Sequence, residues 1–457
     1  MRDMTSGNPF DHIWRYALPI LLANWLQLAY NAIDSIIAGR FIGPDALAAE
    51  GIAAPIMNLV ILSISGICIG AGILMSEHFG AKRMDDLRRT LAVTLLTGLF
   101  LSLAVALLGF IFSDLILKLL FCPSDIFEVT AIYLRITFLG APFTFEYNAL
   151  SSALKSVGDS KTPLRFLAFS SILNAVLDMI LLGIFHMGIT TSAATTVVAQ
   201  AASALLAFHY LMKNAPELMP HKEEWKHDTK IFRDLFRYGA PTAMQQAIQP
   251  IGKLLIQGQV NALGVSSIAA FHAVSRADDF ACIPEQSISS AISTYIAQNR
   301  GAKKPERIKK GFFTGIAMEA VYGVFIALTT YLLRHQIVSL FVTKEAAGEV
   351  IAYGASYLSI MAFFYILPGM TNGFQGYFRG MGRMSMTILG TTVQISFRAL
   401  FTYILAPRIG IRGIAFASAI GWLIMLAIEV PIALYNLLHT NKKKPTSSFP
   451  SDRHQSV

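Results

Sequence analysis

The sequence predicts an all-α integral membrane protein in which twelve transmembrane helices form two parallel six-helix repeats, as N- and C-terminal bundles around a central cavity. The first observation behind this prediction is composition. Residues of the set AVILMFWYC make up 54% of the 457 positions, whereas charged residues make up only 14%. Soluble domains carry about 25% charged residues, which help to cover their surfaces. The composition therefore argues against the soluble enzyme classes.

The second observation is a series of twelve apolar runs of about 20 residues or more, the length that spans a bilayer as a helix. A charged link at 213–235 divides them into two sets of six. We expect an N-terminal bundle at 1–212, a cytoplasmic linker at 213–235, a C-terminal bundle at 236–438 and a cytoplasmic tail at 439–457. The predicted helices cover 14–37, 46–76, 89–112, 126–153, 163–185, 189–212, 236–262, 267–298, 311–333, 347–378, 385–406 and 412–438.

The third observation is an internal repeat. The sequence RYALP at 15–19 recurs as RYGAP at 237–241, and GAKRMDDLRR at 80–89 recurs as GAKKPERIKK at 301–310, which gives offsets of 222 and 221. Because six is an even number of helices, both halves enter the membrane from the same side. The repeats are then parallel and related by an axis along the membrane normal. This architecture places a cavity between two bundles, and its usual use is alternating access.

The distribution of lysine and arginine predicts the orientation. With the N-terminus in the cytoplasm, the inner segments hold about 27 of these residues, including the lysines at 442–444, and the outer segments hold about six. Positive residues gather in cytoplasmic loops. We therefore expect a multi-pass protein of the plasma membrane, the bacterial cytoplasmic membrane, with both termini in the cytoplasm. The net charge of +9 follows from this topology, so nucleic acid is not an expected partner.

Polar residues of the first predicted helix mark a candidate functional site. An ionisable side chain at membrane depth costs about 2.5 kcal/mol or more, so Asp34 is a functional candidate by default. Gln27, Asn31 and Asp34 recur at steps of four and three and share one face, with Tyr30 beside them. A polar stripe on a helix surrounded by lipid must face protein or water. The alternative is that Asp34 is a buried structural carboxylate held by hydrogen bonds.

The fifth predicted helix adds a second carboxylate. Asn174 and Asp178 are four residues apart and share a face. Carboxylates, amides and a hydroxyl that converge in a low-dielectric interior can bind a proton or a hard cation such as sodium. The residues Asp34, Asn174 and Asp178 are thus a possible sodium site, and the choice between proton and sodium stays open.

Three further helices contribute candidates for the substrate cavity. Lys253 lies four residues after Gln249 in the first helix of the second half, and Glu285 lies in the next helix. Lys253 and Glu285 either form a structural ion pair or both line the central cavity and contact charged groups of the substrate. Glu146, beside Tyr147, either attracts a cationic ligand or extends toward the membrane surface. The predicted cavity set is Gln27, Tyr30, Asn31, Glu146, Tyr147, Gln249, Lys253 and Glu285.

The sequence around these residues resembles the multidrug and toxic compound extrusion family, and looks closest to its DinF-type bacterial branch. The resemblance covers nearly the whole chain. It is carried by LAYNAIDSIIAGRFIGPDALAA (28–49), YLRITFLGAPFTFEYNALSSALKSVGDSKTP (133–163), ILNAVLD (172–178) and IAQNRGAKKPERIKKG (296–311). It implies a secondary transporter that exports organic, often cationic and amphipathic, compounds by using an inward proton or sodium gradient.

The resemblance also implies a cation site in the N-terminal bundle. In the DinF-type branch a helix 1 aspartate, a helix 5 asparagine and aspartate, and a helix 6 threonine form this site. They match Asp34, Asn174, Asp178 and Thr196 here, and Thr196 is placed by counting back from Gln200. The matching positions of the second half carry no equivalent acidic pair.

Other classes of function lack sequence support. No Walker-type GxxxxGK[ST] sequence points to ATP, and the ten histidines have no HExxH or other metal spacing. We expect no enzymatic activity, no cofactor, a small organic substrate, membrane lipids as surroundings, and a monomer. A passive channel is disfavoured because repeats with buried titratable groups suit alternating access better. The remaining alternative is a flippase or exporter of a lipid-linked or anionic or zwitterionic metabolite, for which Lys253 is the best support.

Overall fold

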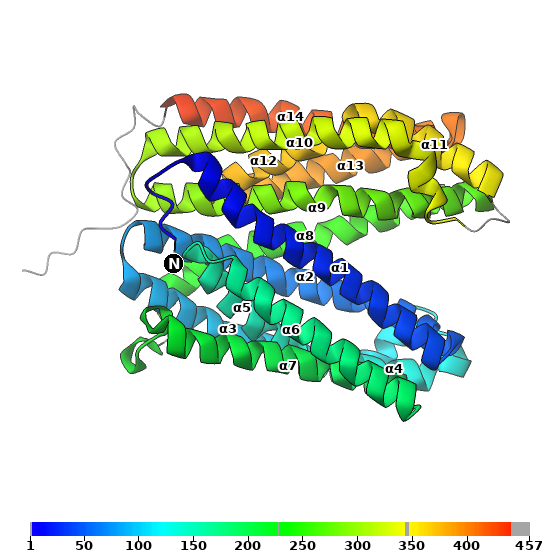
Figure 1. Cartoon of the computed structure of the whole chain (residues 1–457), viewed down its shortest axis with the longest axis horizontal. Helices are drawn as coiled ribbons and strands as arrows, with labels where there is room; N and C mark the ends of the chain where they lie inside the picture. The colour runs from blue at the N-terminus through cyan, green and yellow to red at the C-terminus, as the bar shows by residue number, and fades with distance from the viewer. Residues whose placement is uncertain (1, 227, 343–346, 440–457) are drawn as a thin grey trace, which may run out of the picture.

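The structure is a computed structural model that describes residues 2–226, 228–342 and 347–439. The lysines at 442–444 and nearly all of the predicted tail lie outside these residues. Within them, all regular elements are helices (Figure 1). The elements are α1 (Pro9–Phe41), α2 (Pro44–Gly80), α3 (Met84–Leu119), α4 (Ser124–Leu139), α5 (Ala141–Ser156), α6 (Lys161–Asp178), η1 (Met179–Ile184), α7 (Ile189–Asn214), η2 (Pro216–Leu218), η3 (Lys222–Glu224), α8 (Thr229–Ala262), α9 (Val265–Gly301), α10 (Pro305–Ser339), α11 (Ala347–Phe364), α12 (Ile366–Gly380), α13 (Met384–Ile409) and α14 (Ile411–His439).

The helices make the twelve predicted spans, three of which are interrupted. The pairs α4 and α5, α6 and η1, and α11 and α12 each form one span, and the last pair is bent by 49°. In the described residues nine spans are long and apolar enough to cross a membrane, and the bent pair is a tenth. The other two long helices, α8 and α9, are more polar. The all-α, twelve-helix prediction is confirmed, and α8 and α9 need a polar or aqueous neighbour on part of their surface.

The fourth span of each half is broken, which the sequence did not predict. The first break falls at Gly140, two residues before Pro142, and the second at Tyr365, three residues before Pro368. Proline lacks a backbone N–H and its ring clashes with the preceding turn, so it kinks or breaks a helix. A proline inside a long apolar run does not show which of these happens. The two breaks lie at near-equivalent places in the repeat, so the halves share this feature of the fold.

The two halves of the chain form two bundles that lie side by side (Figure 1). Helices α2 to α7 belong to one bundle, and α8 to α14 belong to the other. Helix α1 runs diagonally across both, and packs against α6 of its own half and α9 of the other half. Helix α1 is therefore placed to respond to any movement of one bundle relative to the other.

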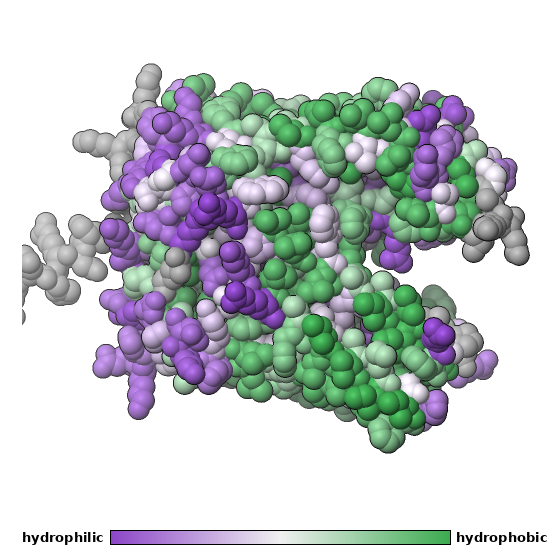
Figure 2. Space-filling model, in the orientation of Figure 1, coloured by the Kyte–Doolittle hydropathy of each residue, from purple (hydrophilic) through white to green (hydrophobic). Residues whose placement is uncertain are grey.

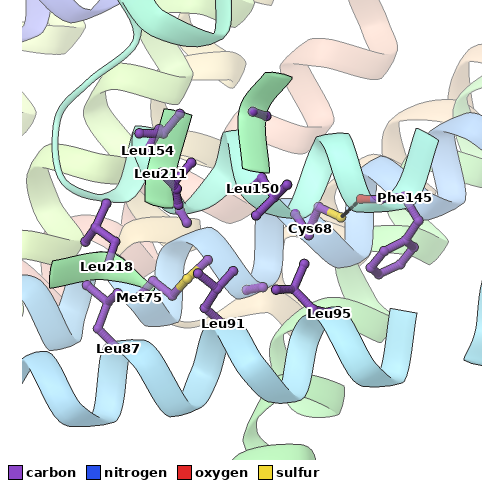
Figure 3. Close-up of a cluster of buried hydrophobic side chains, with 14 of the residues drawn as sticks. Cys68, Met75, Leu87, Leu91, Leu95, Phe145, Leu150, Leu154, Leu211 and Leu218 are labelled. Carbon is purple, nitrogen blue, oxygen red and sulfur yellow. Dashed lines mark hydrogen bonds between the residues drawn. The ribbon is translucent and has the colours of Figure 1, made fainter. Parts of the chain in front are cut away.

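Leucine-rich packing holds the N-terminal bundle together (Figure 3). Side chains from α2, α3, α5 and α7 meet in one buried cluster. Phe145 of α5 lies against Gly98 of α3, where a Cβ would stand 1.7 Å from the ring. Cys68 is buried in the same cluster, and its thiol donates to the Phe145 carbonyl oxygen at 3.9 Å. The cluster fixes the helices on which the polar site is built.

The bundles meet tightly at the end that holds the N-terminus. A Cβ on Gly80 of α2 would lie 1.9 Å from the backbone oxygen of Gln298 in α9, and a Cβ on Gly301 would lie 2.0 Å from the backbone oxygen of Glu77. Both pairs are related by the repeat offset of 221 residues. The contact is therefore reciprocal, as it must be about a pseudo-twofold axis. It explains why the same GAK sequence closes α2 and α9.

A second close crossing joins α2 to α8. Gly66 and Gly70 are four residues apart and lie against Ala243 and Gly239, where a Cβ on either α2 glycine would come within 2.6 Å of the facing backbone. Small residues at this spacing let two membrane helices approach closely. The α2–α8 and α2–α9 contacts together close this end of the molecule, and we call them the seal.

The N-terminal segment, residues 2–8, spans both bundles across the seal. The Arg2 amide donates to the Val157 carbonyl of the N-terminal bundle at 2.7 Å. Met4 is wholly buried, and its amide donates to Gln298 Oε1 at 2.9 Å. Arg307 of α10 donates to three carbonyl oxygens of this segment at 2.9 to 3.1 Å. The segment therefore links α5 to α9 and α10 directly.

At the opposite end the bundles part. Figure 2 shows a hollow between them there, whereas hydrophilic residues gather at the N-terminal end and hydrophobic residues cover much of the middle. An apolar belt with polar ends is the surface expected of a protein that crosses a bilayer. The molecule is closed at one end and open at the other.

Candidate functional site

The predicted coupling residues come together where α1, α6 and α7 meet. Asp178, the last residue of α6, is wholly buried and accepts a hydrogen bond from Thr195 of α7. Asp34 of α1 is half-buried, and its carboxyl lies within hydrogen-bonding reach of Asp178. Two carboxyl groups thus share one site, and α1 supplies the more exposed of them.

Asn174 joins this site one turn before Asp178. In one orientation its amide donates to Thr196 Oγ1 at 3.3 Å. In the other it donates to Asp178 Oδ2 at 3.0 Å and to Tyr30 OH at 3.1 Å, and accepts from the Thr196 backbone N–H at 3.1 Å. The second orientation satisfies more groups, so we adopt it. Thr196 is a neighbour of Asn174, but the hydroxyl that binds Asp178 belongs to Thr195, which the sequence analysis missed by one residue.

A π-helical turn follows Asp178 directly. The segment η1 runs from Met179 to Ile184 and continues the span that begins as α6. Such turns are rare, and they frequently lie at functional sites because the extra residue disturbs the regular hydrogen bonding of the helix. The interruption sets Asp178 at a change of helix geometry.

Two residues that the sequence analysis did not single out lie close to the site. The Ser35 hydroxyl donates to Glu50 Oε1 of α2 at 3.2 Å. Tyr133 of α4 is near enough to interact electrostatically with both Glu50 and Asp34. Glu50 could have been predicted, because it is an acidic residue within the predicted apolar helix 46–76. It forms no polar stripe with other residues on its helix face, so the pattern that indicated Asp34 does not occur here.

The site can bind a hard cation or a proton by its chemistry. Its groups are carboxyl, amide and hydroxyl oxygens, the donors that sodium prefers, and burial favours a neutral carboxyl over a charged one. Among the described residues no group of three His, Cys, Asp or Glu side chains is placed to hold a metal ion. The arrangement therefore does not resemble a transition-metal centre.

Three of the predicted cavity residues lie on the polar stripe of α1. Gln27 donates to Asn31 Oδ1 at 3.0 Å, and Asn31 is exposed. Tyr30, between them, contacts Asn174 rather than open space. The stripe thus joins the acidic site to the molecular surface.

Tyr147 and Glu146 of α5 lie inside the N-terminal bundle. The Tyr147 hydroxyl donates to the Pro163 carbonyl at 3.0 Å, and its ring packs against the core cluster of Figure 3. One carboxyl oxygen of Glu146 is buried and accepts no hydrogen bond. The structure gives Tyr147 a packing role at the start of α6.

Lys253 and Glu285 do not form the ion pair that was one of the two alternatives for them. Lys253 Nζ lies 2.8 Å from Asp279 Oδ1 of α9, and both side chains are largely exposed, at 64% and 47%. Glu285 is wholly buried within the C-terminal bundle, 3.5 Å from the Asn372 amide. Positions six residues apart on a helix point about 120° away from each other. Asp279 therefore faces α8, and Glu285 cannot face α8 as well. Because Glu285 is buried within the C-terminal bundle, it does not line the predicted central cavity.

The residue after Asp279 contacts α1. This residue, Phe280, stacks on Trp25 of α1 with 5.2 Å between ring centroids and an interplanar angle of 11°. Gln249 is exposed on α8 one turn before Lys253. These polar positions explain why α8 and α9 are less apolar than the other spans.

Asp278, beside Asp279, connects three helices. Tyr365, at the break between α11 and α12, donates to its carboxyl, and Arg398 of α13 lies near enough to attract it. The sequence showed two adjacent acids at this place, but not which way each would point.

The protein has two repeated bundles that are joined at one end and parted at the other, and a buried acidic site. These features are typical of a polytopic membrane protein of the two-bundle transporter class. Comparison with known proteins agrees. The sequence profile of the MatE family matches this chain twice, at residues 19–180 and 241–404, and the matches begin one repeat offset apart. The chain belongs to the MatE family. The resemblance in the sequence is thereby confirmed, and its DinF-type branch stays a prediction.

Relatives of similar length support the assignment. The probable multidrug resistance protein YpnP of Bacillus subtilis is 29% identical over 92% of this chain and 94% of its own length. The probable multidrug resistance protein YoeA of the same organism is 31% identical over 85% of each chain. An outward-facing structure of a multidrug resistance MATE family transporter has a TM-score of 0.90 at 20% identity, covering 96% of this chain and 98% of that chain. A transporter of the MOP superfamily from Pyrococcus furiosus has a TM-score of 0.89 at 19% identity with the same coverage.

Proposed function

We propose that this protein is a secondary active antiporter that exports organic, often cationic and amphipathic, compounds while protons or sodium ions move inward. The observation that carries this proposal is the joining of Asp34 and Asp178 in one site on helices of the N-terminal bundle. The naming of the relatives as multidrug resistance proteins supports an organic substrate.

The orientation follows from the basic loops. The sealed end holds the N-terminus and the basic sequences after α2 and α9, and positive loops stay in the cytoplasm. We therefore place the seal in the cytoplasm and the hollow toward the outside, in a plasma-membrane protein with both termini inside. In this outward-open state ions from outside reach the acidic site first.

The cycle rests on α1. Loading a proton or sodium ion on Asp34 and Asp178 removes the repulsion between two carboxylates and favours a different packing of α1. Because α1 packs against both bundles, that change alters the balance between outward- and inward-open states. The ion must bind the two states with different affinity, since otherwise it shifts nothing. Substrate is released outward, and the emptied, ion-loaded protein returns inward. We propose that one chain is a complete transport unit.

Transport by the purified protein in liposomes tests the proposal. A proton gradient and a sodium gradient, each with the higher ion concentration inside the liposomes, are imposed separately, and accumulation of a fluorescent organic cation is followed. We expect one gradient to drive transport and its dissipation to stop it. Substrate movement that ignores both gradients, or ionic current through a single open state, would refute the antiport mechanism.

A second candidate is export of a lipid-linked or anionic or zwitterionic metabolite. The exposed pair Lys253 and Asp279 favours it, because adjacent opposite charges suit a zwitterionic group. Competition of phosphorylated or zwitterionic lipid precursors with the organic cation in the same liposomes distinguishes the two. Inhibition that depends on Lys253 would favour the metabolite.

A further inference from the structure

Two glutamates lie buried in the C-terminal bundle without hydrogen bonds adequate for charged groups. Glu285 of α9 and Glu319 of α10 both have 0% exposure. Neither oxygen of Glu319 has a hydrogen-bond partner, and neither does Oε1 of Glu285. The Asn372 amide, at 3.5 Å from Glu285 Oε2, is the hydrogen-bond donor that the described residues offer the pair.

The two carboxyls face the same small space. A Cβ placed on Gly369 of α12 would lie 3.4 Å from Glu319 Oε2 and 3.6 Å from Glu285 Oε1. The absence of a side chain at Gly369 therefore leaves room for both. The pair is near enough for each carboxylate to repel the other.

No cation in the described part of the chain forms an ion pair with either glutamate. Among the described residues no ion pair joins Glu285 or Glu319 to a lysine or arginine. The titratable groups that face them are Cys282 and Asp278 of α9 and Tyr322 of α10, and none of these carries positive charge. A buried carboxylate without a positively charged partner takes up a proton, because the charged form is costly away from water. Burial without a cation therefore favours the neutral form of both glutamates.

We propose that Glu285 and Glu319 form a proton-binding site in the C-terminal bundle, separate from the Asp34–Asp178 site, which is loaded and closed in this state and exchanges its protons with water in another state. This inference rests on the proposed function, because exchange requires alternation between states. On loading, a carboxylate oxygen takes a proton from water, and on release it returns that proton to water.

A cavity lies beside the pair. Pro284 and Met318, which precede the two glutamates in the chain, line a cavity of about 1000 Å³ between α1, α9 and α10. Tyr322 lines the same cavity, and its hydroxyl donates to the Ala281 carbonyl at 2.8 Å. Tyr322 also lies near both carboxyls. The other residues that line the cavity are mainly apolar, so water reaches the carboxyls only if α1 or α10 moves.

Infrared difference spectroscopy of the purified full-length protein in lipid tests the site. The carboxylic C=O band is recorded in light and heavy water for the wild type, Glu285→Gln, Glu319→Gln and the exposed control Glu306→Gln on α10. We expect each buried variant to lose part of a protonated-carboxyl signal that the wild type and the control retain. We also expect deuterium shift of that signal to be slow at rest and faster during transport.

Two results would overturn the inference. One is a carboxylic band unchanged in both variants, which would mean that the glutamates carry no protons. The other is a band that never shifts faster when substrate and gradient are added, which would make the protons permanent. If the wild type shows no gradient-driven transport, the proposed function fails, while the resting band still reports whether the glutamates are protonated.

Discussion

The N-terminal and C-terminal bundles share one fold but hold their buried acids differently. Asp178 accepts a hydrogen bond from Thr195 and shares its site with Asp34, which is only half-buried. Glu319 is wholly buried, and neither of its oxygens has a donor. The two halves therefore share the same helix packing, but their buried acidic residues lie at different positions and have different hydrogen-bond partners. The comparison predicts a hydrated, exchangeable site in the first half and a closed one in the second.

The largest effect is expected at the acidic site of the N-terminal bundle. Asp34→Asn and Asp178→Asn should abolish gradient-driven transport, because an amide cannot take up and release a proton or neutralise a sodium ion. The measurement is accumulation of a fluorescent organic cation in liposomes, with Asp125→Asn, an exposed aspartate of α4, as the matched control. Normal transport by a correctly inserted Asp34→Asn protein would remove the basis for assigning the two sites different roles.

The next effect concerns the seal that joins the bundles. Gly80→Ala places a Cβ where Gln298 already stands, and such overpacking costs about 1–3 kcal/mol, which shifts the closed state by roughly 5–150-fold. Reagent labelling of a cysteine introduced at the sealed end should rise accordingly. Gly51→Ala on the same helix meets no atom within 4 Å and serves as the control. Equal labelling of both variants would show that the α2–α9 contact does not hold the seal.

A smaller effect is expected where the N-terminal segment crosses the bundles. Arg307→Ala removes the donor to the Met4, Ser6 and Gly7 carbonyls, and a hydrogen bond to a charged group contributes about 1.5 kcal/mol, roughly tenfold in opening. Hydrogen exchange of residues 2–8 measures this. Lys310→Ala, an exposed change three residues further on, should leave exchange unaltered. Unchanged exchange in Arg307→Ala would mean that other contacts, such as the bond from the Met4 amide to Gln298, hold the segment.

The smallest effect on stability is expected at the exposed pair of α8 and α9. Lys253→Ala should change the free energy of unfolding by about 0.2–1 kcal/mol, because exposed ion pairs are well solvated. Its effect on substrate preference should be larger, with anionic compounds competing less well. A double-mutant cycle with Asp279→Asn separates the pair from other effects. A loss of stability well above that range would place the pair in a structural role instead.

The fold could be predicted because the features that determine it are visible along the sequence. Low charge, twelve apolar runs and a repeat offset near 222 residues can be recognised without knowing which residues are in contact. The two helix breaks could not be predicted, since Pro142 and Pro368 are compatible with a kink as well as a break. They depend on how neighbouring helices receive the freed backbone groups.

The acidic site could be predicted only partly. Asp34 and Asp178 lie on different helices, and their convergence came from family resemblance rather than spacing. Thr195 and Asp279 were not predicted, because a sequence does not show, to within one residue, which side chain of a helix reaches a given partner. Glu319 was missed because it stands alone in an apolar helix, and its meaning depends on Glu285 and Gly369 from two other helices.

The reciprocal crossing of Gly80 and Gly301 has a consequence for control. Its contacting atoms are the backbone oxygens of Gln298 and Glu77, and peptide oxygens do not titrate in the physiological range. A proton therefore does not loosen this backbone contact by binding to its oxygens, and titration at the crossing falls on the Glu77–Arg300 ion pair beside it. An ion bound at the Asp34–Asp178 site, in contrast, changes the crossing only by tilting whole helices around it.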